Sequence, residues 1–563
     1  MKKKMNLIKI FSFAAILSAG YSMTALAEDG WVEEENGWAY YEGEGERAVS
    51  QLLEIDENYY YFGEDGLMVR NQWVAVENME TGLDEPEHYW YYFQDNGKAY
   101  KRSNSTPSGV TRMKEIDGKK YSFDSEGRML FGWVLDGERL TDEDAWKEGE
   151  YYFGGENDGV MKDGWQKIHI VADPDDESLP DDGIWEEEDQ ERWFYFSENG
   201  KKFKGRENKM AKLERHGNKY GFDQYGRMIS SWYADPTLIT TEEYDKTASP
   251  EENLKERQGG SEYTREFMYF GYPESGAQYT KGWFTARPSR YLMESKFLEE
   301  STYTYYADGD GHLYANEIRT IDGKRYAFDN YGRQIRGLVC LEMEDEDTSS
   351  KIVNVWYQDK KDREFSSIEE FNDLIAYERE NSKGSLVENY ESDFESRKRR
   401  FYYFGGKDGE MLTGTHEITL ASDEKVEFCF ANSGSLKGSG LFGKKNDKLY
   451  KAGMVLKPKE GQKYAIVRME TETKMVGETE KTFDTLNIIE TKDFIKEICN
   501  TGIYDEEEDE TVWTVRGKIP NVQYYLVSQS GKIVENKKSA KDGDGYQFCV
   551  KNGRIKSITL EEQ

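Results

Sequence analysis

The sequence contains few of the residue types from which metal sites and many active sites are built. It has four cysteines and five histidines among 563 residues. The cysteines form no CxxC pair, and no histidine stands at metal-ligand spacing from them, which argues against a zinc site. The histidines are isolated from one another, and we find no nucleophile–base pair in residues 441–563, where the repeats leave room for an enzyme. We therefore expect a protein that is not an enzyme and that has no catalytic residue, no metal and no cofactor.

The four cysteines could form disulfides, and two acidic segments could bind calcium. Four cysteines allow three disulfide pairings, and the sequence does not choose among them; the cysteines are Cys340, Cys429, Cys499 and Cys549. The flanking segments EFCF and QFCV favour burial of Cys429 and Cys549 as small apolar residues. The segments DGDGH (308–312) and DGDGY (542–546) lack the acidic residue that completes a calcium loop, so we predict turns.

Long apolar runs are also scarce. The one at the N-terminus, IFSFAAILSAG, follows four lysines and precedes Ala25-Leu26-Ala27, which is typical of a secretory signal over residues 1–27. No other run approaches the roughly 20 residues needed to span a bilayer. The C-terminal residues KSITLEEQ carry no sorting signal. We expect a secreted protein, extracellular or associated with the cell wall, without a built-in anchor.

Basic residues are outnumbered, 75 against 110 acidic ones, for a formal charge of −35. Without the four lysines of the signal the charge becomes −39. Such a field repels nucleic acid and anionic lipid, so we expect neither as a partner. Salt screens charges beyond about 8 Å, which leaves a local site for a neutral or cationic ligand open.

Aromatic residues, by contrast, are abundant: 40 Tyr, 27 Phe and 13 Trp. They recur in related segments separated by about a hundred residues, KKYSFDSEGRMLFGW (119–133), NKYGFDQYGRMISSW (218–232) and KRYAFDNYGRQIRGL (324–338). In the first, Tyr121 and Phe123 share one strand face, a turn follows at 124–127, and Met129, Phe131 and Trp133 share one face of the return strand. A lone hairpin is marginal in water, so we expect the copies to stack as a solenoid.

The repeats are interrupted by acidic segments, which we predict to be solvated loops; these are 171–191, 239–262 and 340–351. Helical spacing and capping residues predict short helices at 366–380 and 491–502, the second with Thr491 as its N-cap. Beyond residue 440 the pattern changes. We therefore divide the chain into the signal (1–27), a hairpin-repeat region (28–440) and a β-rich C-terminal module with degenerate repeats (441–563).

A GW pair, an aromatic triplet such as WYYF and an xxGxM turn recur over residues 31–440. This pattern resembles the choline-binding or cell-wall-binding repeat family, and is also similar to glucan-binding repeats and to the C-terminal repeats of clostridial toxins. The resemblance implies an all-β fold, a β-hairpin solenoid, with a ligand held between consecutive hairpins in a cage of aromatic rings. Ring faces attract a quaternary ammonium ion by about 0.5–2 kcal/mol each.

Carried onto this sequence, the resemblance implies the following cages: Trp73 with Trp90 and Tyr92, Trp133 with Tyr151, Trp165 with Trp193 and Tyr195, and Trp283 with Tyr303 and Tyr305. Met129 and Met161 match the methionine that lines the family's cages. The sequence departs from the family in spacing, because each tryptophan precedes its triplet by 17 to 28 residues. The third repeat also has Leu338 in place of tryptophan. Cages therefore require the acidic insertions to loop out.

Three functions remain open from these patterns. The first is a non-catalytic surface protein held on the bacterial cell wall, with choline-decorated teichoic acid or a wall glycan as the polymer bound. The second is a released adhesin that binds host or dietary polysaccharide through the same rings. The third is a structural spacer in which the aromatic residues only form the core.

Overall fold

The computed structural model describes residues 30–561 except 80–84, 104, 108, 173–184, 186, 208, 235–260, 345–349, 357–398, 421–422, 460, 477–478, 508 and 543. The predicted signal, the predicted helix at 366–380 and most of the acidic insertions lie outside the described residues. The protein is mostly β, with 50% strand and 5% helix, which confirms the all-β class. The chain divides into two compact units, which we describe separately: unit 1 (1–242 with 269–278) and unit 2 (243–268 with 279–563). The predicted three-part division stays a prediction.

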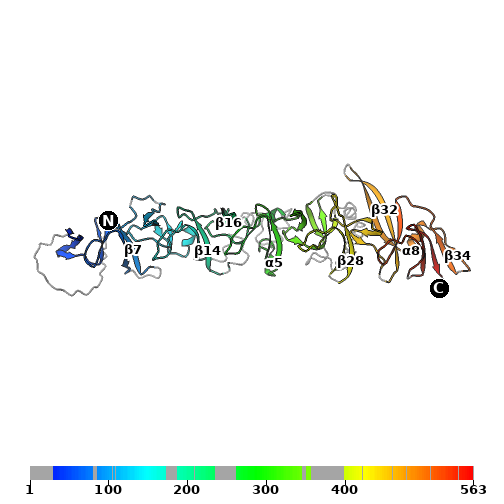
Figure 1. Ribbon diagram of the computed structural model, residues 1–563, viewed down its shortest axis with the longest axis horizontal. Helices are drawn as coiled ribbons and strands as arrows, with labels where there is room; N and C mark the ends of the chain where they lie inside the picture. The colour runs from blue at the N-terminus through cyan, green and yellow to red at the C-terminus, as the bar shows by residue number, and fades with distance from the viewer. Residues whose placement is uncertain are drawn as a thin grey trace, which may run out of the picture. The chain divides into compact units, whose positions relative to one another are not determined.

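Unit 1 is a series of antiparallel hairpins that follow one another in chain order, from blue to green in Figure 1. Its strands are β1 (Gly30–Glu34), β2 (Gly37–Glu42), β3 (Glu46–Arg47), β4 (Gln51–Ile55), β5 (Asn58–Phe62), β6 (Gln72–Glu77), β7 (His88–Phe93), β8 (Lys114–Ile116), β9 (Lys119–Tyr121), β10 (Trp133–Leu135), β11 (Glu138–Arg139), β12 (Tyr151–Tyr152), β13 (Gly164–Val171), β14 (Asp189–Phe196), β15 (Ala211–Arg215), β16 (Asn218–Phe222), β17 (Ser231–Tyr233) and most of β18 (Met268–Phe270). Its helices are the 3-10 turn η1 (Gly43–Gly45) and the one-turn α1 (Ala145–Glu148).

One backbone hydrogen bond joins each of these hairpins to the hairpin before it. After a hairpin's second strand and turn, an N–H donates to a carbonyl of the preceding hairpin: Met68 to Trp38 (2.6 Å), Ala99 to Tyr59 (2.9 Å), Met129 to Trp90, Met161 to Lys120 and Met228 to Trp193 (all 2.8 Å), Lys202 to Glu150 (2.7 Å), and Gln278 to Lys219 (2.8 Å). Apart from Gln278, each donor residue also lies against the glycine in the next hairpin's turn. The recurring Met and Gly of the sequence are therefore partners across hairpins.

The recurrent segment 119–133 does not form one hairpin. Tyr121 ends a hairpin that begins with β8, and Phe123 makes a single bridge to Met129 after the turn. Trp133 then opens the next hairpin, in β10. The expectation that Met129 and Trp133 share one return strand is therefore wrong, because left-handed Gly132 separates them.

The turn itself is held by an aspartate and an arginine. The Oδ1 atom of Asp124 accepts hydrogen bonds from two turn N–H groups, and its Oδ2 accepts one from Nε of Arg128 (2.6 Å). Asp223 with Arg227 repeats this arrangement in unit 1, and Asp329 with Arg333 repeats it in unit 2. The shared FDxxGR pattern therefore encodes a turn clamp.

Unit 2 continues the hairpins and ends in larger sheets. Its strands are β19 (Gly282–Ala286), β20 (Tyr303–Ala307), β21 (Glu317–Ile321), β22 (Lys324–Phe328), β23 (Gln334–Ile335), β24 (Gly337–Met343), β25 (Ile352–Trp356), β26 (Arg399–Phe404), β27 (Gly414–Thr419), β28 (Lys425–Phe430), β29 (Gly443–Lys445), β30 (Lys448–Lys451), β31 (Met454–Val455), β32 (Tyr464–Val476), β33 (Thr479–Ile489), β34 (Ile503–Asp505), β35 (Glu510–Thr514), β36 (Val522–Ser528), β37 (Lys537–Lys541), β38 (Tyr546–Lys551) and β39 (Arg554–Glu561). Its helices are α4 (Ser261–Arg265), α5 (Glu294–Leu298) and α8 (Thr491–Ile498). The largest sheets have the orders β27-β28-β31-β30-β29 and β34-β35-β39-β38-β37.

Several sequence expectations about unit 2 are corrected or confirmed. The acidic segment 340–351 does not begin as a loop: residues 340–343 are in β24, the central strand of its sheet, where Cys340 and Leu341 are buried. Helix α8 confirms the predicted helix, but Glu490 is its N-cap and it ends at Ile498. The DGDGH and DGDGY segments are turns, closed by the carboxylates of Asp308 and Asp542.

All four cysteines are free thiols; Cys429 is buried as predicted, whereas Cys549 is half-buried. Across the described part of the chain, no helix has the length and apolar character needed to cross a membrane.

Candidate functional site: aromatic corners between hairpins

The same cluster of rings is built four times. In each copy a tryptophan on a hairpin's first strand lies opposite a tyrosine on the second: Trp31 and Tyr40, Trp73 and Tyr92, Trp165 and Tyr195, Trp283 and Tyr306. The same tryptophan contacts a tyrosine of the following hairpin, with ring centroids 4.8, 4.8, 4.9 and 4.7 Å apart for Tyr60, Tyr121, Tyr220 and Tyr326. We call these clusters the Trp31, Trp73, Trp165 and Trp283 sites.

A second tryptophan completes three of the four sites. Two residues before the cross-strand tyrosine stands Trp38, Trp90 or Trp193, on the same strand face. The paired indoles lie at right angles where both rings are in contact: 6.4 Å and 80° for Trp31 with Trp38, and 6.3 Å and 84° for Trp165 with Trp193. The fourth site has Thr304 at this position, so it lacks one wall.

The walls of the three complete sites are reachable from solvent. Trp38 is 40% exposed, and the other tryptophans of these sites are half-buried. Two perpendicular indoles form a corner, in which a ligand would contact the face of one ring and the edge of the other. Ring faces are negative, so such a corner suits a cation or the apolar face of a sugar.

Residues from the hairpin two places further on reach two of these sites. Trp90 donates its indole N–H to Oδ1 of Asn157 at 3.0 Å. In the Trp165 site Trp193 donates to Oε2 of Glu274 at 3.4 Å, and Lys167 pairs with the other carboxylate oxygen at 2.8 Å. Hydrogen bonds from Lys167 and Trp193 lower the pKa of Glu274, so the rim of this site carries a carboxylate paired with an ammonium group.

The chain already places its own cations on these rings. Lys114 lies 5.0 Å from the Tyr100 ring beside the Trp73 site, Arg215 lies 5.4 Å from Tyr195, and Arg319 lies 5.1 Å from Tyr314 beside the Trp283 site. The ring surfaces of these sites therefore attract positive charge within the folded protein.

Two of the predicted aromatic pairings are wrong by one residue. Trp133 contacts Tyr152 (5.0 Å), whereas Tyr151 points to the opposite face and packs with Val134, Phe153 and Met161. Side chains alternate along a strand, so a slip of one residue moves a side chain to the other face.

The same slip affects the fourth site. Trp283 contacts Tyr306, whereas Tyr305 is buried on the other face and stacks on Phe284. Tyr303 lies on the Tyr305 face, since it is two residues away on the same strand. The predicted groupings around Trp73 and Trp165 are brought together, and Met129 packs beside the first.

The sequence analysis missed the Trp31 site. Its signal was the pair of GW dipeptides at 30–31 and 37–38, followed by the Tyr40–Tyr41 pair. The role of every one of these side chains as a ligand contact stays a prediction.

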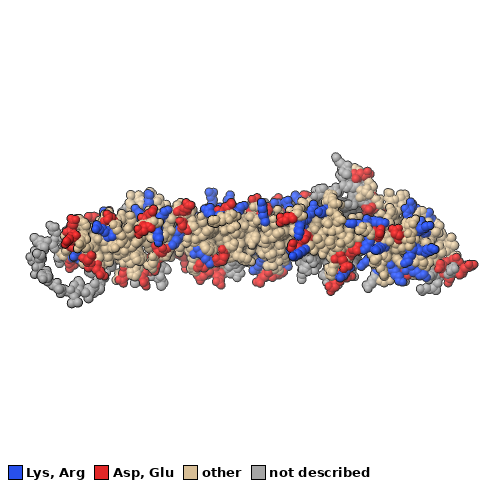
Figure 2. Space-filling model, viewed as in Figure 1, with Lys and Arg blue, Asp and Glu red and all other residues tan. Residues whose placement is uncertain are grey.

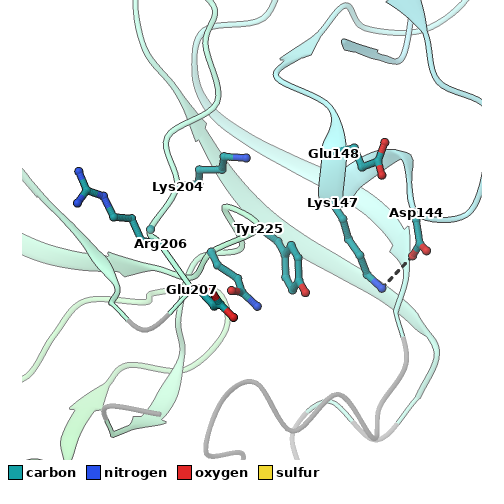
Figure 3. Close-up of a pocket in the computed structure, with 9 residues that line it drawn as sticks. Asp144, Lys147, Glu148, Lys204, Arg206, Glu207 and Tyr225 are labelled. Atoms are coloured by element: carbon teal, nitrogen blue, oxygen red, sulfur yellow. Dashed lines mark ion pairs between the residues drawn. The ribbon is translucent and has the colours of Figure 1, made fainter. Parts of the chain in front are cut away.

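The described residues also line a cavity of about 510 Å³ beside α1, away from the complete aromatic sites. Figure 3 shows Asp144 paired with Lys147 on one side, while Arg206 points away on the other. Lys204, Glu148, Glu207 and Tyr225 complete a lining of mixed charge. Its side chains are mostly exposed, which is typical of a solvated hollow between hairpins.

Charge is divided unequally along the sequence. Residues 441–563 contain 21 basic and 21 acidic residues, so the whole net charge of −39 belongs to residues 28–440. Figure 2 shows acidic and basic side chains interspersed over unit 1, whereas Lys and Arg gather over the C-terminal strands of unit 2. The aromatic sites of unit 1 therefore lie in an acidic surrounding that favours cations over anions.

Comparison with known proteins gave the following matches. No protein-family model matches the sequence. Glucosyltransferase-S of Streptococcus mutans serotype c is 21% identical over 328 residues, which is 53% of this chain and 18% of that protein's length. Among solved structures, choline binding protein F of Streptococcus pneumoniae is 14% identical, with 76% of this chain and 98% of that chain covered and a TM-score of 0.25. The autolysin LytC of the same species is 17% identical, with 56% and 51% covered and a TM-score of 0.26.

The chain is similar to choline-binding and glucan-binding repeat proteins. It spans less than a fifth of its curated relative, and the TM-scores are low. We therefore base the functional proposal on the aromatic sites.

Proposed function

We propose that the protein is a non-catalytic extracellular protein that attaches to the bacterial cell wall through aromatic sites along a β-hairpin solenoid. The ligand in this proposal is choline on a wall polymer such as teichoic acid. One observation carries it: in the Trp31, Trp73 and Trp165 sites a tryptophan contacts two tyrosines at ring distances that agree within 0.1 Å, and a second tryptophan stands at the same strand position in each. Half-buried rings leave part of this repeated surface open to a ligand.

The solenoid is supported by the regular link between hairpins. Seven successive donors in unit 1 bond to the preceding hairpin at 2.6–2.9 Å, each from the residue after the turn. A repeated contact with the same geometry gives each hairpin the same step relative to its neighbour. Each corner then lies at the junction of two such steps, because its tyrosines come from consecutive hairpins.

The energetics favour a polymer over a free small molecule. Two or three cation–π contacts of about 0.5–2 kcal/mol each correspond to a dissociation constant on the order of a millimolar at one site. Three sites that bind one repeating polymer can raise the overall affinity by about 10²- to 10⁴-fold without further contacts. Weak, repeated sites are therefore sufficient for attachment to a wall.

A second candidate is a glycan-binding protein. The sequence match to a glucosyltransferase over 328 residues favours it, because the matched stretch includes more than half of this chain. The flat apolar face of a sugar would stack on the same indoles. The carboxylate of Glu274 would attract the charge of choline, whereas a neutral sugar could use it only as a hydrogen-bond acceptor, and this difference separates the two candidates.

The test is a titration of intrinsic tryptophan fluorescence with choline chloride and, separately, with isomalto-oligosaccharides. The variant Trp193→Ala removes one wall of the Trp165 site, and Tyr272→Ala is the matched control, since Tyr272 is largely exposed and outside the sites. We expect saturation with choline that W193A weakens and Y272A does not. Saturation with the oligosaccharide alone would favour the glycan candidate, and no response to either would refute binding through these rings.

A further inference from the structure

A fifth ring cluster, around Trp133, follows the plan of the other four with three exchanges. Trp133 contacts Tyr152 at 5.0 Å and, from the next hairpin, Phe194 at 5.2 Å and Phe196 at 5.9 Å, so Phe194 stands where the other sites have a tyrosine. The place of the second tryptophan, two residues before Tyr152, is taken by Glu150. The third exchange is Lys202.

Lys202 stands where the other complete copies have methionine. It forms the bridge Phe196–Lys202, as Met68, Met129 and Met228 bridge to their own phenylalanines. Its stem packs against Gly226 of the next hairpin's turn, as those methionines pack against Gly97, Gly159 and Gly276. The lysine therefore occupies the methionine slot, with an ammonium group in place of a thioether.

The ammonium group is enclosed by rings and carbonyls. Lys202 is only 6% exposed, and its Nζ lies 5.0 Å from the Trp133 ring. It donates to the carbonyl of Trp146 at 2.6 Å and to that of Lys147 at 3.2 Å, at the end of α1. Helix α1 covers the cluster, and Trp133 is 8% exposed where the tryptophans of the complete sites are half-buried.

We propose that the Lys202 side chain is a built-in occupant of the Trp133 cluster and that its amino group takes the place of an external ligand. The Trp133 cluster then serves only to hold three hairpins together. External ligand binds at the Trp31, Trp73 and Trp165 sites. The second half of this inference rests on the proposed function; the first half does not.

The charges around Lys202 predict a pH signature. Burial lowers the pKa of the ammonium to about 7, and Lys204 acts in the same direction, while Asp223 and Glu150 oppose them. The Arg227 guanidinium and the Lys147 ammonium lie over the adjoining Trp146 ring, at 4.9 and 5.4 Å. Between about pH 7 and 10.5 the unfolded chain therefore binds more protons at Lys202 than the folded chain.

The first test compares the wild type with Lys202→Met by urea unfolding from pH 6.5 to 9.5. Linkage predicts that the wild type gains stability relative to this variant as pH rises, by up to about tenfold in the unfolding constant per pH unit. Lys201→Met is the control, because Lys201 is an exposed neighbour whose variant should run parallel to the wild type. A stability difference that does not change with pH would show that folding does not lower the pKa of Lys202, and it would overturn the enclosure of its amino group.

A measurement on the wild type covers the case in which Lys202→Met does not fold. Brief acetylation with an amine-reactive ester, read by mass spectrometry, should label Lys201 at least tenfold faster than Lys202, with no choline present. Equal labelling would refute the enclosure.

The claim that the Trp133 cluster takes no external ligand is tested by the number of choline equivalents that the protein binds. Trp133→Phe should bind as many as the wild type, whereas the loss of one equivalent would show that the cluster takes external ligand. A wild type that binds no choline would refute the proposed function, while the pH and acetylation results would still decide the role of Lys202.

Discussion

The turn clamp predicts a graded loss of stability at two sites with the same sequence pattern. In unit 1, Asp223 and Asp124 accept the same three hydrogen bonds, two from backbone N–H groups and one from an arginine Nε. Their surroundings differ: the side chains of Asp223 and Arg227 are 2% and 6% exposed, whereas those of Asp124 and Arg128 are 15% and 29% exposed. Burial is therefore the variable that separates the two sites.

Replacement of each aspartate by alanine removes the acceptor and leaves the arginine. At Asp223 the remaining guanidinium is buried and loses its carboxylate, which costs about 3–5 kcal/mol. At Asp124 the guanidinium can turn to water and to Glu126, so the loss is about 1–2 kcal/mol, near that of two neutral hydrogen bonds. Asp223→Asn should fall between wild type and D223A, because the amide oxygen can still accept from the backbone.

The assay is hydrogen exchange followed by mass spectrometry, on peptides that include each turn, together with urea unfolding monitored by tryptophan fluorescence. D223A should accelerate exchange at its own turn by about 10²-fold or more, and D124A by about tenfold. Equal effects at the two turns would refute the reasoning, since the sequence pattern alone would then decide the strength of the clamp.

Three further outcomes are expected. Gly159→Ala should destabilise unit 1 by about 1–3 kcal/mol in thermal unfolding, because an added Cβ would overlap the buried Met129 side chain; Gly118→Ala has a similar left-handed φ but free space, so its smaller loss measures the backbone strain alone. Thr304→Trp should complete the fourth corner and add one choline equivalent in calorimetry, and an unchanged number would show that the second tryptophan is not sufficient. Glu274→Gln should weaken choline binding by about threefold to tenfold, while leaving any oligosaccharide binding unchanged.

The sequence by itself determined the local structure. Alternating aromatics such as Tyr121 and Phe123, with an Asp and Gly in the turn, specify β-hairpins, because side-chain alternation and left-handed glycine are properties of a few neighbouring residues. The recurrence of these segments also indicated that the rings bury one another across hairpins. The groups around Trp73 and Trp165 followed from the resemblance to the choline-binding repeat family.

Only the tertiary structure decided which face each ring occupies and what surrounds it. The strand register places Tyr152 rather than Tyr151 beside Trp133, and one residue is enough to reverse the face. The enclosure of Lys202 depends on carbonyls more than 50 residues away in the chain, and the burial of the Asp223 clamp depends on Trp146 and Tyr225 around its arginine. Burial and charge environment are sums over distant neighbours, and for that reason no local pattern in the sequence could supply them.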